Sequence, residues 1–139
     1  MKLRLALSVL AVTSLSLGAA SVSAHNTTIP TNFDFTSLAT NTDTPGWDTT
    51  WEARLKSNSG ACISDRRAQI IGTFDGERRV VDADRSSRNG FLRLGGEGGP
   101  AQSAKLDRIV AKVLDKRIGP SGHRHVCTGP DPIVQVILH

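Results

Sequence analysis

Histidine and cysteine are the residue types in this chain whose chemistry is most readily recognised. Cleavage after Ala24 would make His25 the first residue, where a free α-amino group and an imidazole Nδ1 can together chelate one copper ion. A second imidazole must lie nearby, and on an extended strand His123 and His125 would point to the same side. His139 is a further candidate. These residues allow a copper site; the alternative is a chance N-terminal histidine and an exposed His-Arg-His turn.

The two cysteines, Cys62 and Cys127, are most economically explained by one intramolecular disulfide. An oxidising compartment lets a disulfide form, and an even number of cysteines leaves no free thiol. The bridge would close a loop of about 66 residues, which the chain-entropy model values at roughly 4 kcal/mol. That contribution matters because the chain has two Trp, four Phe and no Tyr, so its core must rely on smaller aliphatic side chains.

The first 24 residues have the three parts of a secretory signal. Lys2 and Arg4 are followed by an apolar stretch over residues 5–17 and by a small-residue end at residues 22–24. We therefore expect cleavage after residue 24 and a secreted, extracellular or periplasmic protein, with no membrane span in the mature chain. Without this segment, 115 of the 139 residues remain, with 15 basic and 13 acidic side chains and a formal charge of +2. A charge so close to neutral does not predict a nucleic-acid partner.

Other groups of reactive side chains do not define a reaction. Ser86 and Ser87 lie in a charged segment without the Gly-x-Ser-x-Gly motif of a nucleophile elbow. Asp75, Asp82 and Asp84 resemble a calcium loop in composition, but arginines lie among them, so ion pairing on a solvated face is the preferred interpretation. No catalytic residues are assigned.

Strand patterns dominate the elements that would position these residues. Residues 48–56 alternate strictly between apolar and polar, and further extended stretches cover residues 67–74, 78–83, 91–94 and 133–138. Asp75-Gly76 and Asn89-Gly90 are tight-turn dipeptides, and residues 95–100 are expected to form a flexible loop. The Thr- and Asn-rich residues 25–46 are interpreted as an arm or linker, with pairing onto the domain through Ile29, Phe33 and Phe35 as the alternative.

Residues 103–118 are ambiguous. Leu106, Ile109, Val110, Val113 and other apolar residues follow helical spacing, which alone favours a short helix ending at Gly119. The alternation of apolar and charged residues over 108–113, and the strand character of the neighbouring segments, favour a strand.

A longer pattern joins these signals. An arginine, Arg66 or Arg67, follows Cys62, and then come a strand, Asp75-Gly76, a second strand, Asp84, Asn89-Gly90-Phe91, a basic strand and the run from Gly122 to Cys127. This order resembles small secreted bacterial domains of the transthyretin-like or carboxypeptidase-regulatory-like class, which are related in architecture to the B-type repeats of adhesins. The resemblance covers about residues 51–136. It departs from the class in the longer spacing between Asp84 and Gly90, and in Leu106 and Ile109 where aromatic residues are common.

The resemblance implies an immunoglobulin- or transthyretin-like β-sandwich without an active site. We therefore predict an all-β fold: a single antiparallel β-sandwich of about seven strands over residues 47–139, locked by Cys62 and Cys127. The expected function is a secreted, non-catalytic module that binds an extracellular protein or surface ligand, or has a structural role. The alternative is an extracellular or periplasmic copper protein that uses His25 with His123 or His125.

Overall fold

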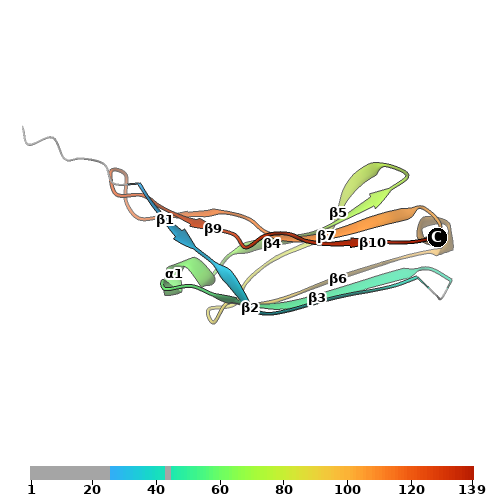
Figure 1. The fold of residues 1–139 in the computed structure, drawn as a ribbon, viewed down its shortest axis with the longest axis horizontal. Coiled ribbons are helices and arrows are strands. Elements are labelled where there is room, and N and C mark those ends of the chain that lie inside the picture. Colours follow the sequence, from blue (N-terminus) through green and yellow to red (C-terminus); the bar gives the residue numbers. More distant parts are fainter. Residues whose placement is uncertain (1–25, 43–44) are drawn as a thin grey trace, which may run out of the picture.

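Two β-sheets pack face to face in the computed structural model, which describes residues 26–42 and 45–139 (Figure 1). The predicted signal segment and His25 lie outside the described residues. The three-stranded layer has the order β2 (Asn32–Asn41), β3 (Trp47–Lys56), β6 (Phe91–Gly98). The four-stranded layer has the order β10 (Ile133–Val136), β7 (Leu106–Val113), β4 (Arg67–Phe74), β5 (Glu77–Arg85).

A third, smaller sheet lies at the end of the sandwich opposite the C-terminus (Figure 1). This end sheet has the order β1 (Thr27–Pro30), β9 (His125–Thr128), β8 (Lys116–Ile118). Two one-turn helices, α1 (Gly60–Ile63) and α2 (Pro100–Ser103), complete the described elements. The prediction of an all-β sandwich with one disulfide is confirmed. Residues 47–139 form eight strands where about seven were expected, and β1 and β2 bring the described strands to ten. No helix among the described residues is long and apolar enough to cross a membrane.

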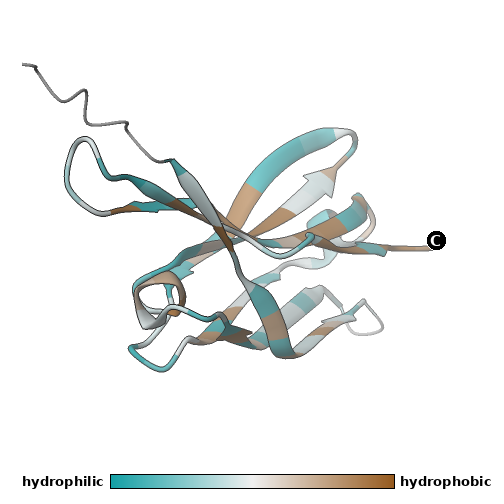
Figure 2. Cartoon of the chain, turned by 60° about the vertical axis from the view of Figure 1, so that its left-hand side comes forward, coloured by the Kyte–Doolittle hydropathy of each residue, from teal (hydrophilic) through white to brown (hydrophobic). Residues whose placement is uncertain are grey.

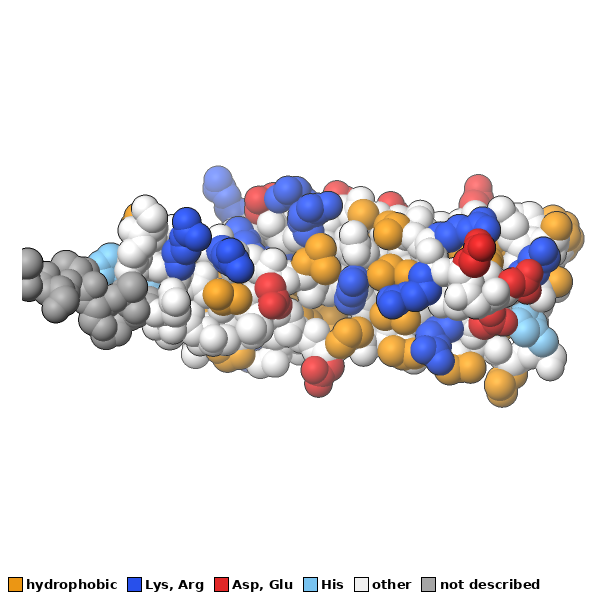
Figure 3. Space-filling model, turned by 90° about the horizontal axis from the view of Figure 1, so that it is seen from above, with side chains coloured by type: hydrophobic (Ala, Val, Ile, Leu, Met, Phe, Trp, Pro, Cys, Tyr) orange, Lys and Arg blue, Asp and Glu red, His pale blue; other side chains and the backbone are white. Residues whose placement is uncertain are grey.

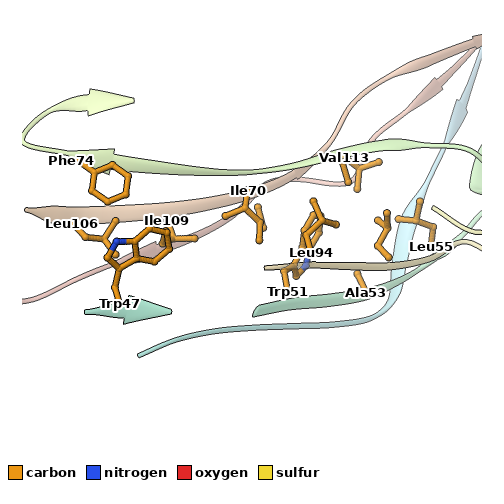
Figure 4. Close-up of a cluster of buried hydrophobic side chains, with 13 residues drawn as sticks. Trp47, Trp51, Ala53, Leu55, Ile70, Phe74, Leu94, Leu106, Ile109 and Val113 are labelled. Atoms are coloured by element: carbon orange, nitrogen blue, oxygen red, sulfur yellow. The ribbon is translucent and has the colours of Figure 1, made fainter. Parts of the chain in front are cut away.

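The core lies between the two layers and follows from the alternation that the sequence shows. Along β3, every second side chain from Trp47 to Leu55 points inward and is buried, while the side chains that alternate with them are mostly exposed. Figure 2 shows the same alternation as hydrophobic and hydrophilic bands along the strands. Across the core, Figure 4 shows the Trp47 ring facing Phe74, and the two ring centroids are 5.6 Å apart. The remaining buried members are Ala68, Ile70, Leu92, Leu94, Leu106, Ile109, Ala111 and Val113.

The two predicted turn dipeptides lie in different kinds of connection between strands. Asp75-Gly76 joins the antiparallel strands β4 and β5, and both residues have positive φ angles, 51° and 80°, as a type I′ hairpin turn requires. Asn89-Gly90 instead lies where the chain passes from β5 in one layer to β6 in the other. Gly90 has φ +79°, and a Cβ there would lie 2.9 Å from the Leu55 carbonyl oxygen. Glycine is therefore needed at this crossing.

The ambiguous segment 103–118 contains strand β7, not a helix over most of its length. Leu106, Ile109, Ala111 and Val113 are buried, and the register shifts where Phe74 pairs with Leu106 and Thr73 pairs with Arg108. The shift inserts one extra residue into β7. Because of this bulge, the inward residues Leu106 and Ile109 are three positions apart, whereas the later inward residues are two positions apart. The single spacing of three produces the helix-like pattern.

Two further segments differ from their predicted states. Residues 27–41, within the expected arm, form β1 and β2, which pair with β9 and β3. The alternative of pairing onto the domain is therefore the arrangement in the structure. Residues 95–98, within the expected flexible loop, belong to β6. Their glycines leave space for side chains, since a Cβ on Gly96 would collide with Val81 and one on Gly98 with Trp47.

Candidate binding face

The predicted disulfide is present and fastens the end sheet to the sandwich. Cys62 lies in α1, directly before β4, and Cys127 lies in β9; both are completely buried. The bridge joins two residues that are 65 positions apart in the sequence, with strands β4 to β8 between them. Its position indicates a structural role, as the sequence predicts.

A buried arginine lies beside the disulfide and reinforces the same junction. Arg66 has no exposed surface, and its guanidinium donates hydrogen bonds to the carbonyl oxygens of Leu114 (Nη2, 2.6 Å; Nε, 3.1 Å) and Cys62 (2.8 Å). It also donates to the Thr31 hydroxyl at 3.0 Å. Burial lowers the pKa of the Arg66 guanidinium from its ordinary value, and the charge of Asp115 opposes this change. Arg66 is thus a structural cation rather than a binding residue.

The histidines do not gather among the described residues. His123 lies exposed in the turn before β9, so it does not share an extended strand with His125. His125 is half-buried, and its Nδ1 has no hydrogen-bond partner within residues 26–42 and 45–139. His139 lies near the other end of the sandwich, where its Nε2 is 2.8 Å from the Leu106 carbonyl oxygen. In the described part of the chain, no three His, Cys, Asp or Glu residues are placed to hold a metal ion.

The three carboxylates considered for calcium also have separate surroundings. Asp75 forms an ion pair with Lys105 at 3.2 Å, and Asp82 accepts a hydrogen bond from the Gly95 backbone. Asp84 accepts one from the backbone N–H of the residue that follows it. Within the described residues they do not converge on one point, which agrees with their interpretation as solvated surface groups.

The two serines considered as nucleophiles serve the backbone. Ser86 is buried, donates to the Ile63 carbonyl oxygen at 2.6 Å and accepts from the Arg66 backbone N–H at 2.8 Å. Ser87 accepts a hydrogen bond from the Phe91 backbone N–H in the turn before β6.

A row of aliphatic side chains with exposed ends lies on the outer face of the four-stranded layer. In register, Val134 of β10 pairs with Val110 of β7, Val110 with Ile71 of β4, and Ile71 with Val80 of β5. We call these four residues the aliphatic row. Val80 and Val134, at its two ends, are 56% and 52% exposed, whereas Ile71 in the middle is only 7% exposed. The row crosses every strand of the layer.

The sequence contains a signal for this row, in pairs of adjacent apolar residues. Each of the four strands carries two adjacent apolar residues at the point where the aliphatic row crosses it. Neighbouring side chains on a strand point to opposite faces of the sheet. One member of each pair must therefore leave the core, except where a bulge intervenes, as it does beside Val81. The inward members are Ile70, Val81, Ile109 and Ile133.

Basic side chains flank the aliphatic row on both sides. Arg78 and Arg108 pair with Thr73 in the neighbouring row toward the β4–β5 hairpin, and Lys112 pairs with Gln69 in the row on the other side. Figure 3, which looks onto this face, shows hydrophobic side chains in its middle with Lys and Arg side chains around them, and Asp and Glu side chains mostly toward the end opposite the grey segment. The basic rim, as we call this set, comprises Arg67, Arg78, Arg85, Arg108 and Lys112.

A hollow of about 480 Å³ lies where the aliphatic row meets the rim. Its lining includes Arg78, Arg108, Val110 and Val136. It also contains one carboxylate, Asp107, the bulged residue of β7, whose Oδ2 accepts a hydrogen bond from the Gly76 backbone at 3.3 Å. The face therefore combines an apolar strip, cations and a concave edge, features that binding surfaces share.

The outer face of the three-stranded layer has a different character. Phe35 and Phe91 lie on either side of Arg54 in one cross-strand row and are 47% and 41% exposed. In the next row, Glu52 forms an ion pair with Arg93 at 3.3 Å. This face carries charges of both signs, so it provides a control surface for experiments on the other face.

Comparisons of this chain with protein-family models, curated proteins and solved structures gave no match. The resemblance to transthyretin-like domains therefore stays a prediction.

Proposed function

We propose that this chain is a secreted, non-catalytic β-sandwich module that binds a partner outside the cytoplasm. The observation that carries the proposal is the aliphatic row, whose two ends are more than half exposed although they belong to paired strands. The predicted signal segment and the disulfide support its placement in an oxidising compartment.

The exposure of Val80 and Val134 favours a binding role, because exposed aliphatic side chains do not contribute to the stability of the isolated domain in water. Fully burying a valine side chain contributes about 1.5–3 kcal/mol, and this gain is withheld while the outer face is solvated. Val134 and Val136 form exposed apolar surface at one end of the row and Val80 at the other, and apolar surface with a polar border is typical of an interaction site. The disulfide and the layered core hold the strands in fixed register, so the face is preformed.

Two measurements test this function. The full chain is expressed in a bacterium with a periplasm, and the exported protein is weighed by mass spectrometry. We expect the mass of residues 25–139 less two hydrogens for the disulfide. A retained segment 1–24 or two free thiols would contradict secretion through this signal.

The second measurement is binding of the labelled mature protein to washed cell envelopes of the source organism. We expect the double variant Val80→Thr/Val134→Thr to lose binding, because it keeps side-chain shape but replaces exposed methyl groups with hydroxyls. The matched control, Phe35→Thr/Phe91→Thr, removes apolar surface from the opposite face and should bind like the original protein. No binding by the original protein, or equal loss in both variants, would contradict a function through the aliphatic row.

A copper-binding function is the second candidate, and one pairing favours it. β1 runs parallel to β9 with Thr27 opposite His125, so the chain enters the end sheet beside an imidazole two residues after His25. Copper(II) is titrated into the mature chain and into a variant with one extra residue before His25. We expect the extension to weaken binding because it removes the terminal amine from the chelate. Equal or negligible affinity in both proteins would exclude this candidate.

A further inference from the structure

We infer that the partner of the outer face of the four-stranded layer is an acidic polypeptide, with aliphatic side chains lying between its carboxylates. This inference rests on the proposed function, because it names the chemistry of the ligand for the same face. It goes further because net charge alone, at +2 for residues 25–139, gives no reason to expect an anionic ligand.

Cations outnumber carboxylates on this face. The basic rim supplies five cations, whereas one carboxylate, that of the bulged residue Asp107, lies in the hollow beside Arg78 and Arg108. The paired outward positions of the four strands carry no Asp or Glu among the described residues. Arg85 is the one member with a recorded ion pair, to Asp65 at 2.9 Å. Arg67, Arg78, Arg108 and Lys112 have no ion-pair partner within residues 26–42 and 45–139. Cations that outnumber the carboxylates near them raise the local positive potential and attract an anionic partner.

The spacing of the rim specifies how the anionic groups are arranged. Successive outward rows along a strand are about 7 Å apart, so the rows of Arg108 and Lys112 lie about 13 Å apart, with the aliphatic row midway between them. A complementary ligand therefore needs two lines of anionic groups with an apolar strip between them. Four of the five rim residues are arginines, and the planar guanidinium forms paired hydrogen bonds with carboxylates.

The apolar component distinguishes a polypeptide from other polyanions. Sugar rings and lipid interfaces are typically recognised with aromatic side chains, but the outward positions of this layer carry Val, Ile, Ala and Thr in addition to polar residues. Aliphatic side chains pack well on other aliphatic side chains, and a polypeptide can present these together with carboxylates. Charge complementarity and the aliphatic row together therefore favour an acidic protein surface or segment.

Defined probes test this inference with the mature, disulfide-bonded protein. The first is a labelled 20-residue amphipathic peptide of Glu and Leu, and the second is the same peptide with Gln in place of Glu. Alginate and phosphatidylglycerol vesicles represent acidic glycans and anionic membranes. Fluorescence anisotropy, or cosedimentation for the vesicles, gives the affinities. We expect the Glu peptide to bind, to weaken as salt rises, and to bind more tightly than the Gln peptide, alginate or vesicles.

Charge-neutral variants locate the binding. Arg78→Gln/Arg108→Gln/Lys112→Gln removes three cations from the basic rim and should weaken binding of the Glu peptide about tenfold, at roughly 0.5 kcal/mol for each exposed pair. The control Arg54→Gln/Lys56→Gln/Arg88→Gln removes the same charge from exposed positions outside this face and should weaken it less than threefold.

The possible results separate this inference from the function on which it rests. Tighter binding of alginate or of vesicles would overturn the polypeptide assignment, and equal effects of the two triple variants would overturn the assignment to the basic rim. If Val80→Thr/Val134→Thr abolishes envelope binding while the rim variant and salt leave it unchanged, the face binds a partner but the acidic class is wrong. If none of the probes binds and the envelopes do not bind, both proposals fail.

Discussion

Replacing Arg66 with methionine should be among the most damaging single changes in this domain. The guanidinium is fully buried and donates to three acceptors, the Leu114 and Cys62 carbonyl oxygens and the Thr31 hydroxyl. Methionine fills much of the same volume but leaves all three acceptors without this donor. Each unsatisfied buried acceptor costs about 1–3 kcal/mol.

The net cost is smaller than the sum of those losses, because the variant no longer buries a charge. Burying a cation costs several kcal/mol of desolvation free energy, and the methionine variant avoids this cost. Subtracting this from a summed loss of about 3–9 kcal/mol predicts a decrease of about 1–5 kcal/mol in the free energy of unfolding, a large part of the stability of a small domain. Arg66→Lys keeps the charge but not the planar fork, so it should lose an intermediate amount.

Urea unfolding monitored by tryptophan fluorescence measures this change. Trp51 is a suitable reporter because it is fully buried and its Nε1 donates to the Thr36 hydroxyl at 3.0 Å. With a slope of about 1.5 kcal/mol per molar urea, the midpoint should fall by about 1–3 M. The control is Arg67→Met, an exposed neighbour that should change stability by less than about 0.5 kcal/mol. A loss below about 1 kcal/mol in Arg66→Met, with the disulfide intact by mass, would refute the view that Arg66 holds the end sheet to the sandwich.

Three further predictions follow from single features of the fold. Replacing Cys62 and Cys127 together with alanine should lower the free energy of unfolding by roughly 4 kcal/mol in the same urea assay, and a change below 1 kcal/mol would contradict a structural bridge. Gly90→Ala should cost about 1–3 kcal/mol, because its φ of +79° and the nearby Leu55 carbonyl oxygen both oppose a Cβ, and an unchanged thermal midpoint would contradict this. Gln135→Leu should raise the thermal midpoint, because the Gln135 Oε1 is buried without a partner among the described residues; a lower midpoint would show that the amide is needed.

The strands that could be predicted are those whose pattern is set by burial. β3 alternates strictly because one face of it meets the core, and the alternation is visible in the sequence. β2 has no comparable pattern because it is an edge strand with mostly exposed or half-buried side chains. It is held by backbone pairing with β3, with Phe33 and Leu38 adding limited contact with the core. An exposed edge strand can therefore have a composition rich in Thr and Asn, and this composition does not identify it as a strand in the sequence.

The candidate binding face could not be predicted because it depends on the register between distant strands. Adjacent apolar pairs such as Ile70-Ile71 and Ile109-Val110 are visible in the sequence, but either member could face the core. The pairing of Ile71 with Val110 and with Val80 is what turns separate residues into one row. Net charge was equally uninformative, since it sums over both faces and hides the gathering of cations on one of them.

The end sheet has a consequence for the order in which the domain folds. Thr27 pairs with His125, so β1 can join the end sheet only after the much later strand β9 is in place. Cys127 lies in the same late strand, whereas the β2–β3 and β4–β5 pairs join neighbouring segments and close short loops first. The disulfide can therefore form only after the chain between residues 62 and 127 has brought its two ends together. Oxidation then traps a topology that is already assembled, while the earlier hairpins form without covalent guidance.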